Sequence, residues 1–405
     1  MKKKVIVFSS RITHPAVWPN TMSLASAISQ SGFDVLLCDI NENRFATLFY
    51  CQKLLREQPD SIAFTLGISD CGLDAPDLEQ DGEWRPVPRP AVVPHVSFLF
   101  DTPYNFPAIK DTLQHDMPRH IITLMDRDSL RYMDLFHPEK HKLFLPVAGT
   151  ESDAGIDELL SRPRPIGLLY CASNWGIDTV QAWHLPEWTD SSSVPLLDDI
   201  AEYMMTHPVT TGRAIEAVLH LRGLDEPEYL QRLQPCFWPL LRYIKPYRRQ
   251  KALSLLLESD IPVHVIGDYW KDTPFAQKLT IHPRVNYDEF LQLIDQSKAI
   301  FSDMGEFNNG GHERVFTAML HGTAVVSEYS QYLAEEFNAD DDIIFYDFGK
   351  RAQNISHIPK LLNDDAYRER MVRRAYQKAY ARHRWQNRAR ALIDALALLY
   401  PERFV

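Results

Sequence analysis

The sequence predicts an α/β fold made of two parallel-sheet domains. Along most of the chain, apolar runs of strand length alternate with stretches whose apolar residues recur at helical spacing. Such alternation is typical of parallel sheets covered by helices. A chain of 405 residues is also longer than one hydrophobic core usually organises, so two domains are expected.

The first domain is expected at residues 1–150 and contains strand-like segments separated by helical ones. The expected strands lie at residues 5–9, 33–40, 61–66, 96–100, 120–125 and 142–146. The expected helices lie at residues 21–31, 42–57, 106–113 and 127–135. Residues 72–95 are rich in Pro, Asp and Glu and show little periodicity, which predicts a long surface excursion.

The second domain is expected at residues 151–385, and a helical insertion interrupts it at residues 176–244. The insertion is rich in Trp, Leu and Pro, and it is either an inserted subdomain or a surface for protein contact. Strands are expected at residues 165–172, 263–267, 284–286, 298–302, 323–327 and 342–346. Helices are expected at residues 247–258, 287–296, 312–321, 354–362 and 366–383. Residues 386–405 contain a last helix that would pack back on the first domain.

Residues 301–328 are the most informative part of the sequence. An apolar strand leads into a loop with Gly310 and Gly311, and a helix follows at residues 312–321. Glycines at the start of a helix let backbone N–H groups approach a ligand, and the helix dipole adds partial positive charge there. Arg314, in the first turn, has the wrong sign for helix stability but suits a diphosphate, whose oxygens a guanidinium engages in pairs. The alternative is an ordinary strand–loop–helix unit with a surface arginine.

Composition and charge argue against several classes of protein. A net charge of −11 and a pI of about 5.8 argue against a nucleic-acid-binding protein, which normally carries a basic face. The five cysteines are scattered and lack metal-ligand spacing, which predicts free thiols in a reducing compartment. No stretch approaches the ~18 apolar residues of a membrane span, and the apolar run behind the N-terminal lysines is too short for a secretion signal. We therefore expect a cytoplasmic protein without a transmembrane segment, a metal site or a nucleic-acid partner.

Five segments, taken in order, resemble GT-B glycosyltransferases, and specifically the spore-maturation-protein-type (CgeB-like) glycosyltransferases of bacteria. Two segments lie in the first domain: VSFLFDTP at 96–103, similar to a family strand that ends in Asp-x-Pro, and KLFLPVA at 142–148. Three lie in the second: VHVIGDYW at 263–270, RVNYDEF at 284–290, and HERVFTAMLHGTAVVS at 312–327, which is similar to the family signature. The resemblance covers most of the chain outside residues 72–95 and 176–244. It implies the GT-B fold, in which two Rossmann-like domains face a cleft.

The resemblance also implies a nucleotide-diphosphate sugar donor, bound by the second domain, and a sugar transfer to an unidentified acceptor without a metal or other cofactor. Backbone N–H groups of Gly310, Gly311 and His312 would hold the diphosphate, and Arg314 would neutralise its charge. Gly267 would leave room for the nucleotide. The other donor-binding candidates are Tyr269, Asn286, Tyr287, Asn309, Glu313 and Thr317.

The chain departs from the family pattern at two donor positions. Thr317 stands where many GT-B enzymes have a glutamate that binds the donor ribose, and Asn309 stands where another glutamate contacts the sugar. Glu313 is a candidate substitute at a different spacing. These departures leave the ribose contacts and the identity of the sugar open.

The catalytic base would come from the first domain, which the resemblance makes the acceptor side. Asp101 directly follows the strand at residues 96–100 and could point into the cleft, although a helix cap or a turn would explain it too. His14, in the loop after the first strand, is the rival base, and Asp126 is a third candidate. Arg314 is expected to stabilise the leaving diphosphate.

Two basic segments have competing interpretations. Arg248, Arg249 and Lys251 open the helix after the insertion, where a solvated helix face is favoured over a phosphate contact. The basic residues of 368–390 favour a packed helix with a charged outer face, and they leave a peripheral membrane contact open.

Two other classes of function remain open at this stage. A nucleotide-sugar epimerase of the same fold would need further acid and base groups around the donor, which residues 301–328 supply sparsely. A catalytically degenerate scaffold or assembly protein would use the insertion at 176–244 as its contact surface.

Overall fold

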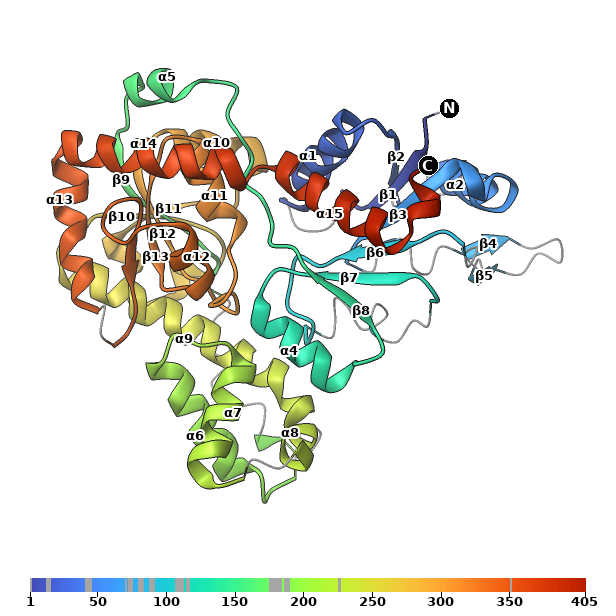
Figure 1. Cartoon of the computed structure of the whole chain (residues 1–405). Helices are drawn as coiled ribbons and strands as arrows, with labels where there is room; N and C mark the ends of the chain where they lie inside the picture. Colours follow the sequence, from blue (N-terminus) through green and yellow to red (C-terminus); the bar gives the residue numbers. More distant parts are fainter. Residues whose placement is uncertain are drawn as a thin grey trace. The chain divides into compact units, whose positions relative to one another are not determined.

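A computed structural model confirms the α/β class and shows two parallel sheets (Figure 1). The structure describes residues 2–11, 16–40, 46–69, 71, 76–78, 84–86, 92–105, 113, 117–174, 184–185, 190–224, 227–349 and 352–405. The chain forms two compact units. The first combines Met1–Ala148 with Trp385–Val405, and the second is Gly149–Arg384.

The first unit is built on a six-stranded parallel sheet with the order β2-β1-β3-β6-β7-β8. Its strands are β1 (Lys4–Ser9), β2 (Asp34–Asp39), β3 (Ile62–Ile68), β6 (His95–Phe98), β7 (His120–Leu124) and β8 (His141–Phe144). Its helices include α1 (Val17–Gln30), α2 (Ala46–Glu57) and α4 (Arg127–Phe136). Within the expected surface excursion, β4 (Pro76–Leu78) and β5 (Trp84–Pro86) form a two-stranded antiparallel sheet. Most of the helix expected at 106–113 lies outside the described residues.

The last helix, α15 (Trp385–Leu399), packs against α1 in this unit. The Trp385 ring lies 6.1 Å from the Phe98 ring, and Arg388 Nε donates to the Pro146 carbonyl at 2.6 Å. A buried guanidinium that bonds to backbone carbonyls fastens the helix to the end of the sheet.

The second unit has a six-stranded parallel sheet with the order β11-β10-β9-β12-β13-β14. Its strands are β9 (Ile166–Cys171), β10 (Val263–Ile266), β11 (Leu279–His282), β12 (Ser297–Ser302), β13 (Ala324–Glu328) and β14 (Ile344–Tyr346). Covering helices are α5 (Ile156–Ser161), α10 (Tyr287–Asp295), α11 (Glu313–Leu320), α12 (Gln331–Glu336), α13 (Ile358–Asn363) and α14 (Asp365–Arg382). The strand expected at 284–286 is wrong. The strand ends at His282, and Asn286 instead caps α10 in a capping box with Glu289.

The strand order of the second sheet reverses next to β9. The chain runs from β9 outward to β10 and β11, and then returns to place β12 on the other side of β9. Open parallel sheets bind ligands outside the carboxyl ends of the strands at such a switch point. The residues that follow β9 and β12 are therefore the first place to search for a site.

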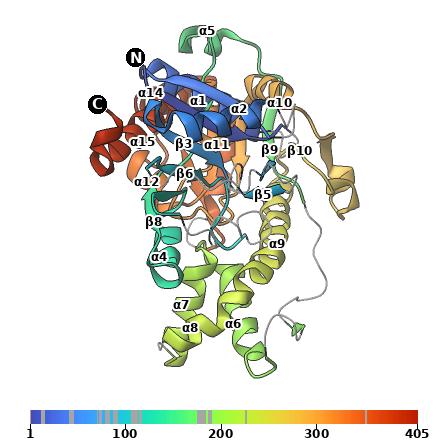
Figure 2. The same ribbon diagram turned by 90° about the vertical axis from the view of Figure 1, so that its right-hand side faces the viewer.

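The helical insertion contains α6 (Val194–Thr206), α7 (Thr211–Arg222) and α8 (Pro227–Leu233), which gather beside α9 (Figures 1 and 2). The boundary expected at residue 244 falls inside α9, because this helix runs without a break from Phe237 to Glu258. Pro246 lies in its interior, where the missing N–H removes one helical hydrogen bond. The N-terminal part of α9 thus belongs to the insertion, and its C-terminal part belongs to the helices that cover the sheet. Among the described residues, no helix is both long and apolar enough to cross a bilayer.

Candidate active site

A buried cluster of charges lies at the switch point of the second sheet. Asp303, the first residue after β12, is 5% exposed. Its carboxylate accepts hydrogen bonds from Arg249 Nε at 3.1 Å and from the Tyr170 hydroxyl at 3.1 Å. The Arg314 guanidinium lies 3.7 Å from Asp303 Oδ1. These side chains come from α9, β9 and α11, so three separate segments meet around one carboxylate.

Three cationic side chains surround the Asp303 carboxylate and set its ionisation. Burial alone would raise the pKa of Asp303, but Arg249, Arg314 and Lys245 outweigh burial and hold this pKa well below its ordinary value. His312 is neutral at pH 7, because burial and the neighbouring Arg314 hold its pKa well below the ordinary value. Three cations therefore face one carboxylate in a place with little solvent.

Arg314 is buried rather than at the surface, which removes the alternative of an ordinary surface arginine. His312 is the N-cap of α11 and accepts the Arg314 backbone N–H at 3.4 Å. The guanidinium bonds to the Cys171 carbonyl at the end of β9. These acceptors and Asp303 compensate for a cation at the positive end of a helix.

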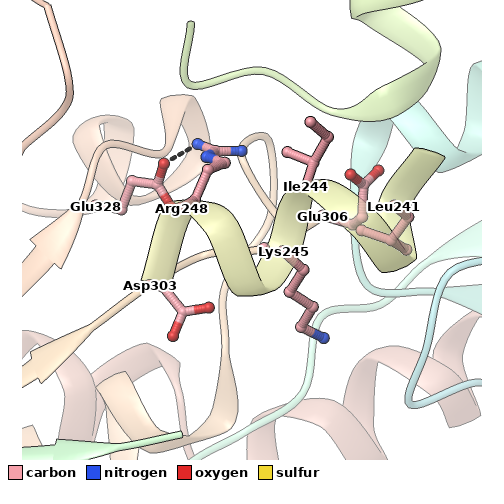
Figure 3. A pocket seen from close by; sticks show the side chains of 8 residues that line it. Leu241, Ile244, Lys245, Arg248, Asp303, Glu306 and Glu328 are labelled. Carbon is pink, nitrogen blue, oxygen red and sulfur yellow. Dashed lines mark hydrogen bonds and ion pairs between the residues drawn. The ribbon is translucent and has the colours of Figure 1, made fainter. Parts of the chain in front are cut away.

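A cavity lies beside this cluster, between α9 and the loop after β12. Side chains that line it include Lys245, Arg248, Asp303, Glu306 and Glu328 (Figure 3). Arg248 forms a buried ion pair with Glu328, whose other oxygen accepts the Met304 N–H at 3.0 Å.

Glu306 connects the cavity wall to the insertion. Its carboxylate accepts the Thr211 N–H at 2.9 Å and the Thr211 hydroxyl at 2.7 Å, at the N-terminus of α7. A carboxylate at a helix N-terminus is favoured by the helix dipole. This contact fastens the insertion to the loop that follows β12.

The solvated helix face expected for residues 248–251 is wrong for two of the three basic residues. Arg248 and Arg249 are 5% and 4% exposed, and Arg249 also bonds to the Ser173 carbonyl at 2.5 Å. Lys251 instead supports the insertion, because its ammonium donates to the Met205 carbonyl at 3.3 Å and lies over the Phe348 ring. Arg248 and Arg249 face the carboxyl ends of the sheet strands, where Glu328 and Asp303 bind them, so the face expected to be solvated is buried.

The glycine candidates have structural roles of their own. Gly267 has a φ of +134°, and a Cβ there would lie 2.6 Å from the Ala172 carbonyl oxygen, so the backbone itself requires glycine. The Gly310 N–H already donates to the Phe307 carbonyl at 3.0 Å. Gly311 and His312 stand at the N-terminus of α11, where a helix carries its partial positive charge. Asn309 is half-buried in the loop before them.

Of the residues expected around the nucleotide, Tyr269 is the one with a ring at the surface. It is 51% exposed and has a φ of +68°, just past the carboxyl end of β10. The Asn286 side chain is used to cap α10. Tyr287 is buried, and its hydroxyl donates to Glu313 at 2.7 Å. Thr317 donates to the same carboxylate at 2.6 Å, so these candidates lie together.

In the first unit, Asp101 is half-buried and accepts a hydrogen bond from Asn105 Nδ2 at 2.8 Å. Asp126, the third candidate base, is fully buried and is the N-cap of α4, where its carboxylate accepts the Asp128 N–H at 2.8 Å. This contact gives Asp126 a structural role. His14 lies outside the described residues.

The basic helix α14 forms many ion pairs. Arg373 pairs with Asp157 at 2.5 Å, Arg374 with Asp341 at 2.6 Å and Lys378 with Asp342 at 2.5 Å. Acidic partners from α5 and from the turn before β14 account for much of its positive charge. This arrangement favours the packed-helix interpretation. In the described part of the chain, no group of three or more His, Cys, Asp or Glu side chains could hold a metal ion.

Residues 248–394 match a family model described as "Glycosyl transferase-like". The matched segment contains Arg249, Asp303 and Arg314, and so most of the charge cluster. The match agrees with the expected class of enzyme and does not distinguish the CgeB-like subtype. It covers less than half of the chain.

Several solved structures are similar to this chain. TarM of S. aureus is 7% identical, with a TM-score of 0.41; the alignment covers 75% of this chain and 54% of TarM, so the chain spans about half its length. Sucrose-phosphate synthase of Thermosynechococcus elongatus is 9% identical over 99% of this chain and 100% of that one (TM-score 0.48). HepE of Anabaena, solved with UDP-glucose, is 10% identical over 97% and 99% (TM-score 0.49). No curated protein matches the sequence.

Asp303 is the central residue that the sequence interpretation missed. An acidic residue directly after an apolar strand was the available signal, since strand ends carry ligand-binding side chains in parallel sheets. Tyr170 and Lys245 offered no comparable signal, because Tyr170 lies within a strand and Lys245 directly follows the expected insertion.

Proposed function

We propose that the protein is a glycosyltransferase whose second unit binds a nucleotide-diphosphate sugar at the β9–β12 switch point. The observation that carries this proposal is the group of three cations, Arg249, Arg314 and Lys245, around the buried Asp303 carboxylate. Buried charges need partners, and a diphosphate supplies two or more negative charges of the required sign. The match of this segment to a glycosyl transferase-like family model supports the choice of ligand.

The chemistry follows from this arrangement. Transfer of the sugar leaves negative charge on the nucleoside diphosphate, and fixed cations in a poorly solvated site stabilise such charge strongly. Arg314, Arg249 and Lys245 would supply those cations, and the N-terminus of α11 would add its dipole. In this proposal the protein's own side chains perform the stabilisation, and the transfer requires no metal ion.

The acceptor side is assigned to the first unit, with Asp101 as the base that takes the proton from the attacking hydroxyl. The order of the five sequence segments favours a CgeB-like transferase.

Equilibrium binding of inorganic pyrophosphate and of a panel of nucleoside diphosphates tests the donor site. Arg314→Ala removes a charge-assisted contact of ~1.5–3 kcal/mol, so the dissociation constants should rise about 10- to 100-fold. Arg370→Ala, an exposed arginine on α14, is the matched control and should leave affinity unchanged. Equal affinities in the wild-type protein and the Arg314 variant would contradict the assigned role.

Incubation with a panel of nucleotide sugars tests the enzyme class. A transferase should release nucleoside diphosphate faster when an acceptor is present, and Asp101→Asn should bind donor normally but lose this stimulation. Interconversion of the donor sugars without release would favour an epimerase. A protein that binds no nucleotide would be neither enzyme.

A further inference from the structure

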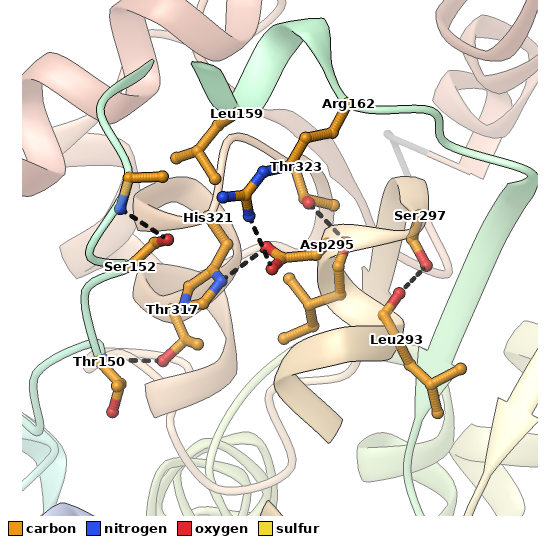
Figure 4. Close-up of polar contacts among 12 residues, drawn as sticks. Thr150, Ser152, Leu159, Arg162, Leu293, Asp295, Ser297, Thr317, His321 and Thr323 are labelled. Carbon is orange, nitrogen blue, oxygen red and sulfur yellow. Dashed lines mark hydrogen bonds and ion pairs between the residues drawn. The ribbon is translucent and has the colours of Figure 1, made fainter. Parts of the chain in front are cut away.

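A hydrogen-bond network surrounds the Glu313 carboxylate at the start of α11. Tyr287 OH lies 2.7 Å and Thr317 Oγ1 lies 2.6 Å from the same carboxylate oxygen, Oε1. Thr150 contacts both hydroxyls: its N–H donates to Thr317 Oγ1 at 3.0 Å, and its hydroxyl lies 2.8 Å from Tyr287 OH. Figure 4 shows Thr150 beside Thr317 in this contact.

The direction of each hydrogen bond is fixed by the chemistry of its partners. A carboxylate can only accept, so both hydroxyls donate to Glu313. Tyr287 OH can then accept from the Thr150 hydroxyl, while Thr317 Oγ1 accepts the Thr150 N–H. The Tyr287 and Thr317 hydroxyls each donate one hydrogen bond and accept one, so the Glu313 side chain is held in one orientation.

The second carboxylate oxygen of Glu313 is not used by this network. Both hydrogen bonds fall on Oε1, and Oε2 takes part in none among the residues that the structure describes. Glu313 is 8% exposed and precedes Arg314, the proposed diphosphate ligand. An oxygen in this position can accept a hydrogen bond from a ligand hydroxyl that lies close to the proposed diphosphate.

We propose that Thr150, Tyr287 and Thr317 are positioning residues that aim Glu313 Oε2 at a hydroxyl of the donor. The donor carries hydroxyls on its ribose and on its sugar, and either could be the one recognised. This inference rests on the proposed function, because it requires a nucleotide sugar at the same site.

The network reaches the segment by which the chain enters the second unit. Gly149 is the first residue of that unit and donates its N–H to the His383 carbonyl at 2.9 Å, next to Arg384, where the chain leaves it. A Cβ at Gly149 would lie 2.5 Å from the backbone of Phe316 and Thr317. The segment at Gly149 therefore packs directly against α11. The next residue, Thr150, contacts the two hydroxyls that hold the Glu313 carboxylate.

The network also controls the ionisation of Glu313. Burial raises the pKa of Glu313, whereas the hydrogen bonds from Thr317 and Tyr287 and the nearby Arg314 and His321 lower it. Cys171 on β9 is the remaining titratable neighbour, and burial raises the pKa of its thiol to about 12, so it stays neutral. Removal of either hydroxyl should therefore raise the pKa of Glu313 further.

Affinities for two probes separate positioning from mere packing. Inorganic pyrophosphate has no ribose or sugar hydroxyl, so Glu313→Gln and Tyr287→Phe should leave its affinity unchanged within about twofold. For the tightest nucleoside diphosphate or its sugar conjugate, the dissociation constant should rise about 10-fold in Glu313→Gln and about 3- to 10-fold in Tyr287→Phe. A loss of affinity for the sugar conjugate alone identifies a sugar hydroxyl as the group that Glu313 recognises. A loss of affinity for both the nucleoside diphosphate and its sugar conjugate identifies a ribose hydroxyl.

The pH profile of nucleotide affinity gives a second readout. Its acid limb should move to higher pH in Tyr287→Phe and Thr317→Val, and it should vanish in Glu313→Gln. Thr150→Ser should behave like the wild type, whereas Thr150→Val should resemble Tyr287→Phe. Tyr380→Phe, on the exposed side of α14, is the matched control.

Two results would overturn the inference in different ways. Equal weakening of pyrophosphate and nucleotide in Tyr287→Phe, with an unmoved acid limb, would mean that the network only supports the fold. Unchanged nucleotide affinity in these variants, while Arg314→Ala still loses it, would refute the positioning role and leave the proposed function intact. If Arg314→Ala has no effect either, the proposed function fails and the inference with it.

Discussion

Replacement of Asp303 by asparagine tests whether the charge cluster is organised around this carboxylate. The variant keeps the size of the side chain but removes the only negative charge that Arg249 and Arg314 contact directly in the described part of the chain. Two guanidinium groups and Lys245 would then face each other in a buried site. Because buried charges without partners are costly, we expect the second unit to be strongly destabilised.

The size of the effect follows from the burial of the pair. Removal of one partner from a buried ion pair costs about 3–5 kcal/mol. In a domain of ~150–250 residues, each kcal/mol moves the melting temperature by about 2–4 °C, so Asp303→Asn should lower it by about 6–20 °C. Asp365→Asn removes an exposed partner of Arg368 and should cause no measurable change.

The same carboxylate should make stability depend on pH. The native pKa of Asp303 is depressed, so near pH 4 the unfolded chain binds more protons than the native one. The contribution of Asp303 is therefore present above its unfolded pKa of ~3.9 and is lost as the pH falls toward its native pKa. Urea unfolding between pH 3.5 and 7 should show a shallower acid slope in Asp303→Asn.

Pyrophosphate provides the decisive comparison in this experiment. Since the variant retains the cations but lacks the competing carboxylate, pyrophosphate should bind it more tightly and restore part of the lost melting temperature. A loss below about 1 kcal/mol, in the range of surface pairs, would show that the cluster is solvated. Weaker pyrophosphate binding in Asp303→Asn would mean that the cations do not form the anion site.

Three further variants test the elements that build the site. Gly267→Ala forces a Cβ against the Ala172 carbonyl at positive φ, and we expect a loss of more than ~1 kcal/mol of unfolding free energy in urea titrations. Trp270→Phe removes the indole N–H that donates to the same carbonyl at 2.6 Å, which should cost about 1–3 kcal/mol by the same measurement. Glu306→Gln disturbs the bonds to Thr211, so amide exchange in α7 should accelerate while the sheet stays protected; unchanged exchange would show that the insertion is held elsewhere.

Much of the fold could be predicted because its signals are local. The helix expected at 312–321 begins and ends within one residue of α11, since His312 caps it and Gly322, with a φ of +67°, stops it. Strands β12 and β13 have apolar centres, Ala299–Phe301 and Ala324–Val326, as buried parallel strands usually do. The strand at 284–286 was misplaced because Asn286 marks a helix start, and its capping box with Glu289 is the more specific signal.

The candidate site was predicted only in part, for a different physical reason. Arg314 and Glu313 belong to a local motif and could be recognised from it. Beyond its own motif, Arg314 contacts the Cys171 carbonyl at the end of β9 and Asp303 just after β12. These residues are far apart in sequence, and such contacts produce no periodic pattern in it. Thr150 is the extreme case, because its role depends on a hydrogen bond to a residue 167 positions away.

The insertion explains why Arg248 and Arg249 were misread. A helix that starts at 247 would show its first turn to solvent, and arginines there would form a charged outer face. Instead, α9 begins at Phe237 within the insertion, and its residues 245–249 lie under the loop after β12, where Glu306 holds α7. The insertion therefore does more than add surface. It extends α9 toward its N-terminus and, through Thr211 at the start of α7, donates two hydrogen bonds to Glu306 in the cavity wall. Loss of this anchor would leave the Glu306 carboxylate less neutralised beside the proposed anion site, so it should weaken pyrophosphate binding.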